Sequence, residues 1–137
     1  MNEPTQLLYT SVARPDLDEA ELARVIEQSA PWNRSSGVAG AVLLHGGRLL
    51  QVLEGPAHAV QGCFRRLSAD TRHEQVTLLQ MGPLPEPRFE PGRTRLARVH
   101  PAFAESVSEV IAQLLQRPDA VNVEAALRLL RNLAPGG

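Results

Sequence analysis

The stretch from Val38 to Pro56 reads VAGAVLLHGGRLLQVLEGP, and it decides the predicted fold. It contains two apolar runs, residues 38–45 and 48–55, separated by Gly46 and Gly47. Two apolar runs joined by a two-glycine turn are typical of a β-hairpin, because glycine readily adopts the positive φ angles that such turns require. The sequence therefore predicts two antiparallel strands in this stretch.

Gln51 is an unexpected residue in the second of these runs. It follows Leu49 and Leu50 and precedes Val52 and Leu53, so both faces of the predicted strand are apolar. A buried amide needs hydrogen-bond partners. The partners of this amide must come from other parts of the sequence.

The segments before and after the hairpin alternate between strand and helix patterns. Residues 6–12 read as a first strand, and residues 16–30 have apolar positions at helical spacing. Asp16 and Glu19 form a predicted capping pair for this helix. We expect it to end before Pro31, since the residue preceding a proline avoids helical torsions.

The rest of the chain continues this pattern. Pro56 opens a second amphipathic segment, and proline suits a first helical turn. The predicted elements are a helix over 56–70, a strand over 75–81, a loop over 82–92, a strand over 93–99, and helices over 103–116 and 120–133.

This order predicts an α+β fold with a ferredoxin-like βαββαβ core, a fifth strand and two extra C-terminal helices. In that plan the first and third strands are central neighbours, so Tyr9 and Gln51 are expected to face the same helix layer. The length of 137 residues suits one domain. We expect residues 1–100 to form its functional part and residues 101–137 to be a helical extension packed on the same domain.

Composition excludes several classes of function. The formal charge of -1 gives no basic patch for direct binding of nucleic acid. The single cysteine, Cys63, excludes an internal disulfide and a cysteine-rich metal site, and the histidines have no ligand-like spacing, so no metal is predicted. The N-terminus has no signal-peptide pattern, and no apolar run has the length of a membrane helix, so we expect a cytoplasmic protein.

Three neutral polar residues are candidates for one shared cleft. Tyr9 and Gln51 lie on central strands, and Asn33 lies just past the predicted end of the first helix. The set has no general base, metal ligand set or nucleophile beside a histidine, so it suits a hydrolase poorly. It suits a flat ring with an amide-like edge, and it places a redox-capable phenol beside that ring.

At these positions the sequence resembles the BLUF family of blue-light sensors that use FAD. The matching segments contain Tyr9 in LLYTS, Asn33 in NRSSGVAG and Gln51 in GGRLLQVLEGP. A further match is SADTRH, which contains Asp70, Arg72 and His73. The resemblance covers roughly residues 6 to 90, and the segment from Gly46 to Pro56 is its most specific part.

The resemblance implies that FAD binds between the two core helices. Asn33 and Gln51 would bond the ring edge, and Val25, Val38 and Ala39 would pack near the ring. Asp70, Arg72 and His73 belong to the matching site, with Arg72 and His73 toward the phosphate end, where an arginine fork suits phosphate oxygens.

The family's photochemistry would then fall to two side chains. After absorption of blue light, Tyr9 would donate an electron and a proton through Gln51, and the Gln51 amide would end up rearranged. The chain would act without substrate turnover. It would signal to a downstream protein partner, either through its C-terminal helices or through a homo-oligomer interface.

The sequence departs from the family on the fifth strand. Counted from Phe89, the positions of the usual Trp and Met hold Gly92 and Thr94, and the residue before Asn33, often polar in the family, is Trp32. Two alternatives therefore stay open. One is a flavin-free ferredoxin-like interaction module, and the other is an acylphosphatase-like hydrolase using VQGCFRR, residues 60–66, as a phosphate loop.

Overall fold

The two-glycine hairpin is the centre of the fold. In the computed structural model, which describes residues 3–134, β2 (Ala39–His45) and β3 (Arg48–Pro56) are joined by Gly46 and Gly47. Both glycines have positive φ angles, 59° and 76°. Two consecutive positive φ angles are the mark of a tight hairpin turn that a side chain would strain. The hairpin prediction is confirmed.

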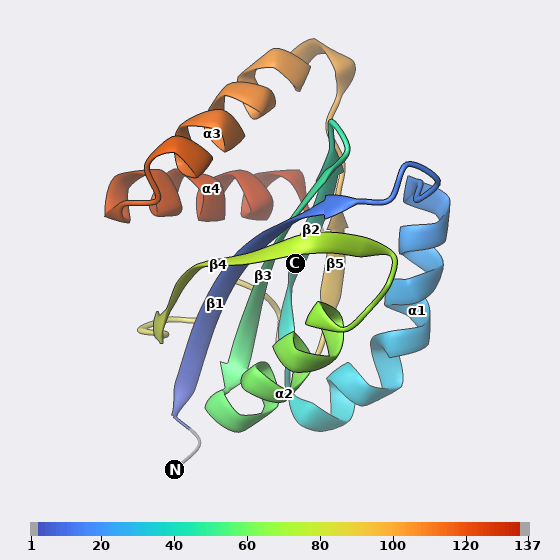
Figure 1. Cartoon of the computed structure of the whole chain (residues 1–137). Coiled ribbons are helices and arrows are strands. Elements are labelled where there is room, and N and C mark those ends of the chain that lie inside the picture. The colour runs from blue at the N-terminus through green and yellow to red at the C-terminus, as the bar shows by residue number, and fades with distance from the viewer. Residues whose placement is uncertain (1–2, 135–137) are drawn as a thin grey trace.

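Five strands form one sheet in the order β4-β1-β3-β2-β5. The first strand, β1 (Pro4–Ala13), lies between β3 and β4 (His73–Pro83) and is antiparallel to both. The short β5 (Thr94–Ala97) pairs in parallel with β2 at the opposite edge (Figure 1). The first four strands have the order of the split βαβ plan, so the ferredoxin-like prediction is confirmed together with its fifth strand.

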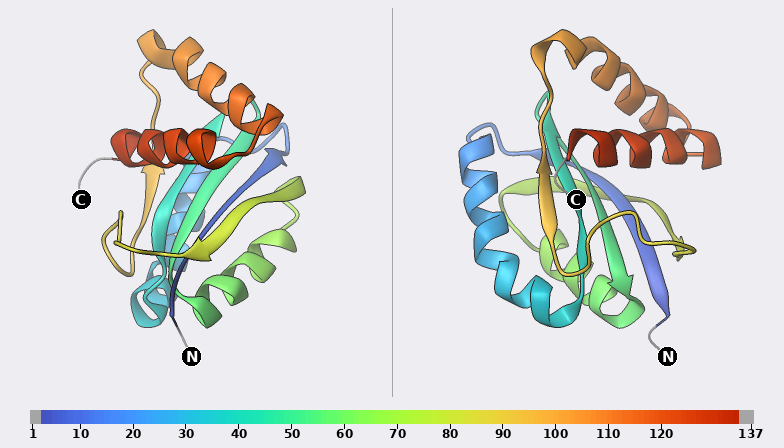
Figure 2. Two further views of the ribbon diagram at one scale, coloured as in Figure 1. Left: turned by 90° about the vertical axis from the view of Figure 1, so that its left-hand side faces the viewer. Right: turned by 180° about the vertical axis from the view of Figure 1, so that it is seen from behind.

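Helices cover the sheet on both faces. The helices α1 (Glu19–Ser36) and α2 (Ala57–Ser68) lie on one face, and α3 (Ala104–Gln116) and α4 (Ala120–Leu133) lie toward the other (Figure 2). A single 3-10 turn, η1 (Pro101–Phe103), leads into α3. The two predicted C-terminal helices are therefore present, and α4 contacts β2, β3 and β5 directly.

The predicted end of the first helix is wrong. Pro31 lies inside α1, which continues to Ser36 and ends where the N–H of Gly37 bonds the Asn33 carbonyl. A proline cannot donate to the carbonyl four residues earlier, here that of Glu27. Both Pro31 and Glu27 are exposed, so water can solvate the unpaired carbonyl. Asn33 consequently lies on the last turn of α1 and not beyond the helix.

Other element boundaries also differ from the predictions. The N-cap of α1 is Asp18, whose side chain accepts from the N–H of Glu21 at 2.8 Å, and not Asp16. The fourth strand begins at His73, two residues earlier than predicted, and β5 is shorter than predicted. These differences do not alter the order of the elements.

Alternation along β3 separates the two sides of the core. Leu50 and Val52 belong to a cluster that includes residues of α3 and α4, whereas Leu53 belongs to a cluster that includes residues of α2. Successive side chains of a strand point to opposite faces, so this division follows from the strand itself. Gln51 and Leu53 thus share the face covered by α1 and α2.

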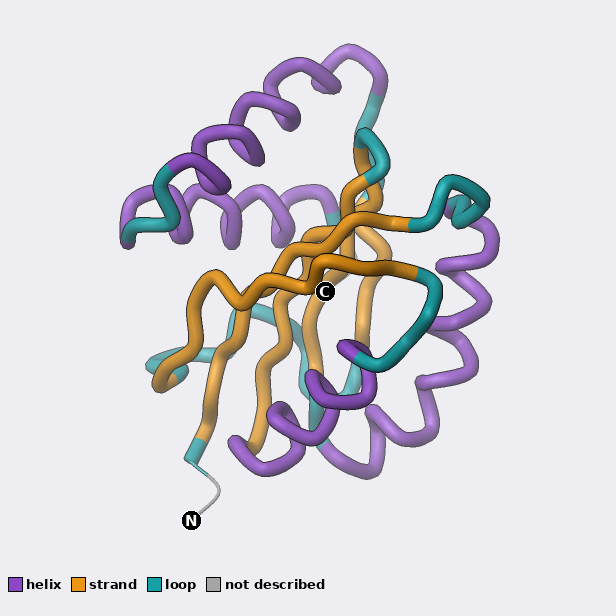
Figure 3. Tube along the Cα trace, viewed as in Figure 1, coloured by secondary structure: helices purple, strands orange, loops and turns teal. Residues whose placement is uncertain are grey.

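The loop of residues 84–93 crosses from one edge of the sheet to the other (Figure 3). It is held by the carboxylate of Glu54, which is 2% exposed. The Oε1 atom of Glu54 accepts from the backbone N–H groups of Arg88 (3.0 Å) and Phe89 (3.2 Å), and Oε2 accepts from Gln6 Nε2 (3.2 Å). One buried side chain of β3 therefore fixes both β1 and the crossing loop.

The same loop is joined to the C-terminal helices. The guanidinium of Arg88 donates to the carboxylate of Glu124 on α4, and this hydrogen bond holds the pKa of Glu124 below its usual value. Arg128 contacts the other carboxylate oxygen at 3.1 Å. Arg88 of the loop thus bonds Glu54 of β3 through its backbone N–H and Glu124 of α4 through its side chain, so the loop connects β3 to α4.

Glu54→Leu should destabilise the fold strongly. It would leave the buried N–H groups of Arg88 and Phe89 without their acceptor, and each unsatisfied buried donor costs about 1–3 kcal/mol. We expect the free energy of unfolding in a urea titration to fall by at least about 2 kcal/mol. The control is Glu86→Leu in the exposed part of the same loop, which should change it by less than about 0.5 kcal/mol. Equal effects of the two variants would contradict the anchoring role.

Candidate functional site

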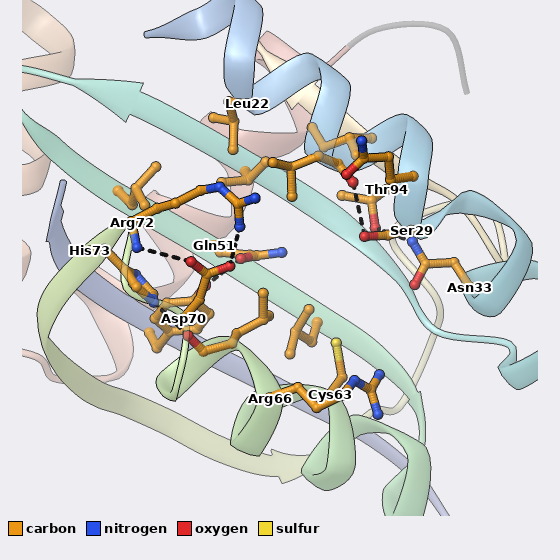
Figure 4. A pocket seen from close by; sticks show the side chains of 18 of the residues that line it. Leu22, Ser29, Asn33, Gln51, Cys63, Arg66, Asp70, Arg72, His73 and Thr94 are labelled. Atoms are coloured by element: carbon orange, nitrogen blue, oxygen red, sulfur yellow. Dashed lines mark hydrogen bonds and ion pairs between the residues drawn. The ribbon is translucent and has the colours of Figure 1, made fainter. Parts of the chain in front are cut away.

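A cavity of about 350 Å³ lies between α1, α2 and the sheet. Its walls are largely apolar, with Leu22, Val25 and Ile26 from α1 and Val42 and Leu49 from the sheet. Polar side chains reach it from several elements (Figure 4). These polar residues are Tyr9, Gln28, Ser29, Asn33, Gln51, Arg66, Asp70, Arg72, His73 and Thr94.

Tyr9 and Gln51 meet on the floor of this cavity. They are directly opposite each other in the antiparallel pairing of β1 and β3, so their side chains share one face of the sheet. The phenol of Tyr9 donates a hydrogen bond to Gln51 Oε1. The expectation that these two residues face the same helix layer is confirmed.

Burial sets the protonation state of Tyr9. Its side chain is 1% exposed, and its ring lies 5.4 Å from the ring of Phe64 and 6.3 Å from that of His73. This desolvation raises the pKa of Tyr9 far above its usual value, and the nearby Cys63 and Asp70 raise it further. The phenol is therefore a hydrogen-bond donor throughout the neutral range.

Only one end of the Gln51 amide has a hydrogen-bond partner within residues 3–134. Its oxygen accepts from Tyr9, whereas Nε2 has no hydrogen-bond partner within residues 3–134. Gln51 lines the cavity and lies between the group around Arg72 and the group around Asn33 (Figure 4). Its NH2 group is consequently available as a donor to a molecule in the cavity.

Asn33 reaches the cavity from the last turn of α1. Its Nδ2 donates to the hydroxyl of Thr94, the first residue of β5, at 3.1 Å. Sequence reasoning treated Thr94 only as a replacement for an expected Met, and did not place it in the site. No local pattern could have revealed this contact, because the two residues are 61 positions apart.

The acidic and basic residues of the SADTRH segment lie at one side of the cavity. Arg72 contacts the carboxylate of Asp70 at 2.6 Å and that of Glu21 at 3.6 Å. His73 instead has both ring nitrogens in internal contacts, Nδ1 with Ser11 Oγ at 2.7 Å and Nε2 with the Leu67 carbonyl. A carbonyl can only accept, so Nε2 carries a proton and donates to Leu67.

Three apolar residues were expected near a bound ring. Val25 lines the cavity. Val38 belongs to the cluster that contains Tyr9 and residues of α2, and Ala39 belongs to the cluster on the opposite face with α3 and α4. Neither Val38 nor Ala39 is among the lining residues of the cavity. Neighbouring residues of an extended chain point to opposite faces, so both could not face the same ring.

Trp32 and Arg66 connect the two helices beside the cavity. The guanidinium carbon of Arg66 on α2 lies 3.8 Å from the centre of the Trp32 ring on α1, a cation–π arrangement. Both residues line the cavity, as does Cys63, whose thiol pKa is raised by burial. The segment VQGCFRR lies wholly inside α2, so it does not form a phosphate loop of the acylphosphatase kind.

Comparison with known families identifies this arrangement. A family model described as sensors of blue-light using FAD, abbreviated BLUF, matches residues 5–93. The chain belongs to the BLUF family. Members of this family are blue-light sensors that bind flavin, and the matched BLUF segment contains β1, the hairpin, both helices of the cavity and β4.

Sequence relatives of this BLUF chain are larger proteins. The photoactivated adenylate cyclase subunit beta of Euglena gracilis is 26% identical over 96% of the chain. The blue light- and temperature-regulated antirepressor BluF of Escherichia coli is 31% identical over 62% of the chain. The chain spans only 16% of the cyclase subunit and 21% of the antirepressor.

Solved BLUF structures share the fold. The dark-state structure of BlrB has a TM-score of 0.73 at 24% identity, covering 96% of this chain and 98% of that one. The photo-activated state of BlsA has a TM-score of 0.79 at 17% identity, covering 98% and 99%. Klebsiella pneumoniae BlrP1 in its manganese and cyclic-diGMP complex is 29% identical with a TM-score of 0.61, covering 68% of this chain and 24% of BlrP1.

Two structural features are absent from residues 3–134. No group of three or more metal-ligating side chains that could hold an ion is present in this part of the chain. None of its helices combines the length and the apolar character needed to cross a bilayer.

Tyr9 should resist deprotonation as long as the protein stays folded. It is the only tyrosine in the sequence, so phenolate absorbance reports on it alone. Because its folded-state pKa is raised, its contribution to stability is complete below the unfolded value of about 10 and is lost as the pH rises above it. We expect phenolate to appear only together with loss of the circular dichroism signal.

The control for this titration is Tyr9→Phe, which should show no phenolate signal and a weaker dependence of stability on alkaline pH. Phenolate forming at about pH 10 with an unchanged circular dichroism spectrum would contradict the assigned environment.

Proposed function

We propose that this protein is a blue-light receptor that binds FAD in the cavity between α1 and α2 and has no substrate turnover of its own. The observation that carries the proposal is the buried pair of Tyr9 and Gln51, in which the phenol occupies the amide oxygen and leaves the amide NH2 facing the cavity. Membership of the BLUF family supports it independently.

The residues present fit a flat heterocycle. The cavity volume lies within the range of about 300–1,000 Å³ that is usual for small-molecule sites. Apolar side chains such as Val25 and Ile26 form its walls, and Gln51 and Asn33 offer hydrogen-bonding groups at one edge. Val38 and Ala39 support the strands beneath the site from the neighbouring clusters.

The phosphate end is assigned to the side of the cavity that holds Arg72. Its guanidinium is nearly half exposed and has a planar fork that suits phosphate oxygens. Asp70 orients it through a short ion pair. We do not assign His73 to the phosphate end, because its ring nitrogens are already bonded to Ser11 and Leu67. We propose instead that its ring supports Tyr9, beside which it packs.

Bound FAD would supply the absorption of blue light and an acceptor for one electron. Tyr9 is the assigned donor of that electron. Its proton has a direct path, since the phenol already donates to Gln51 Oε1. Exclusion of water from this part of the site, where Tyr9 is 1% exposed, would keep the proton between these two side chains.

Gln51 is the assigned switch. If its amide rotates by half a turn, NH2 meets the Tyr9 oxygen and the carbonyl oxygen faces the cavity, so both orientations keep a hydrogen bond to Tyr9. Each such bond contributes only about 0.5–1.5 kcal/mol net, so the two orientations can be close in energy. A buried glutamine is needed here because its two ends have opposite hydrogen-bonding properties.

The output of the receptor is proposed to be a changed protein contact. Its relatives include photoactivated cyclase subunits and a light-regulated antirepressor, in which the matching part is a small fraction of the whole. We assign this role to residues 101–137, whose helix α4 packs on β2, β3 and β5. The proposed partners are a downstream protein and a second copy of the chain.

A flavin-free interaction module is the second candidate. Its support is that Tyr9 pairs with Gln51 and Asn33 pairs with Thr94 within the protein itself. The visible spectrum decides between the two functions. A yellow protein whose flavin band shifts reversibly to the red after blue light supports the receptor, and a colourless folded protein purified with FAD present supports the module.

Gln51→Leu should keep flavin but abolish the light-induced red shift, because it preserves side-chain volume and removes the amide. We expect flavin content within about twofold of wild type, consistent with the loss of one weak hydrogen bond. The matched control is Gln61→Leu on the exposed side of α2, which should photoswitch normally. A normal red shift in Gln51→Leu would refute the assigned switch.

A further inference from the structure

The hydrogen bond between Asn33 and Thr94 joins two elements that frame the cavity. Asn33 lies on the last turn of α1 and is 4% exposed, and Thr94 is the first residue of β5. The Nδ2 atom of Asn33 donates to Thr94 Oγ1 at 3.1 Å. Thr94 stands at the position where the resemblance to the BLUF family predicts methionine, which is apolar.

Backbone contacts hold the chain that leads into Thr94 and β5. A Cβ atom on Gly92 would lie 3.2 Å from Arg34 Cα and 3.3 Å from the Asn33 carbonyl oxygen, and Gly92 has a φ angle of 77°. The chain leading into β5 therefore passes close to the end of α1, where a tryptophan would not fit. On the other side, the N–H of Gly40 bonds the Arg93 carbonyl at 3.0 Å.

The bond to Thr94 holds the Asn33 side chain at the cavity. With Nδ2 donating to Thr94, the Oδ1 atom has no hydrogen-bond partner within residues 3–134, and Asn33 lines the cavity. Asn33 thus offers an acceptor where Gln51 offers a donor through Nε2. Together the two amides offer one acceptor and one donor to a molecule in the cavity.

We infer that Thr94 is a positioning residue, which holds the Asn33 side chain at the cavity so that the other end of its amide bonds a polar group on the edge of the bound ring. This inference rests on the proposed function for the identity of the ligand. Through Thr94, strand β5 directly contacts Asn33, one of the residues proposed to bind the ring. Thr94 acts through Asn33 and needs no contact with the ring itself.

The size of the effect follows from one neutral hydrogen bond. Without the hydroxyl, the Asn33 side chain can leave this position, so its binding position must be selected when the ring binds. A net contribution of about 0.5–1.5 kcal/mol corresponds to roughly 2- to 12-fold in affinity.

The test in the loaded protein compares Thr94→Val with Thr94→Ser. Thr94→Val removes the hydroxyl at nearly constant shape, and it should weaken FAD binding roughly 2- to 12-fold in a fluorescence titration. It should also shift the ring carbonyl stretching bands in the infrared spectrum of the bound flavin. Thr94→Ser should restore both, and Thr77→Val on the exposed part of β4 is the matched control.

A second measurement needs no cofactor. In flavin-free protein, the side-chain NH2 resonances of Asn33 should exchange with solvent more slowly in wild type and Thr94→Ser than in Thr94→Val. Unchanged exchange in Thr94→Val would overturn the positioning role, as would unchanged affinity and carbonyl bands in the loaded protein. Failure of wild type to bind FAD, with the exchange difference present, would refute the proposed function and the ligand assignment but leave the Asn33–Thr94 contact established.

Discussion

The antiparallel register of β1 and β3 is the constraint on which the site depends. It places Tyr9 directly opposite Gln51, on the face covered by α1 and α2. A slip of one residue would turn one of these side chains to the opposite face, where the C-terminal helices lie. The register is itself secured by the burial of both faces of β3, because a slip would exchange the side chains of the two faces.

The order of the strands and helices could be predicted from the sequence because local patterns determine it. The glycine pair between two apolar runs marked the hairpin, and period-two alternation placed Tyr9 and Gln51 on one face. The end of α1 could not be predicted in this way. Pro31 is a strong local stop signal, but its ring and the carbonyl it leaves unpaired both lie on the exposed side of the helix.

The site was predicted less completely than the fold. Tyr9, Asn33 and Gln51 do line one cavity, because β1, β3 and the first helix lie where they were predicted, although Asn33 is on that helix and not beyond its end. The contacts of Asn33 with Thr94 and of Trp32 with Arg66 join residues far apart in the sequence, and no periodicity encodes them.

The central strand β3 is a wall shared by two compartments of the molecule. Leu49, Gln51 and Leu53 face the cavity, while the alternate positions, including Glu54, face the crossing loop and the packing of α4. The two compartments are separated by the thickness of a single polypeptide. Any change in the pleat or twist of this strand therefore moves side chains on both faces of the sheet at once. No chain of intervening residues is needed to transmit the change.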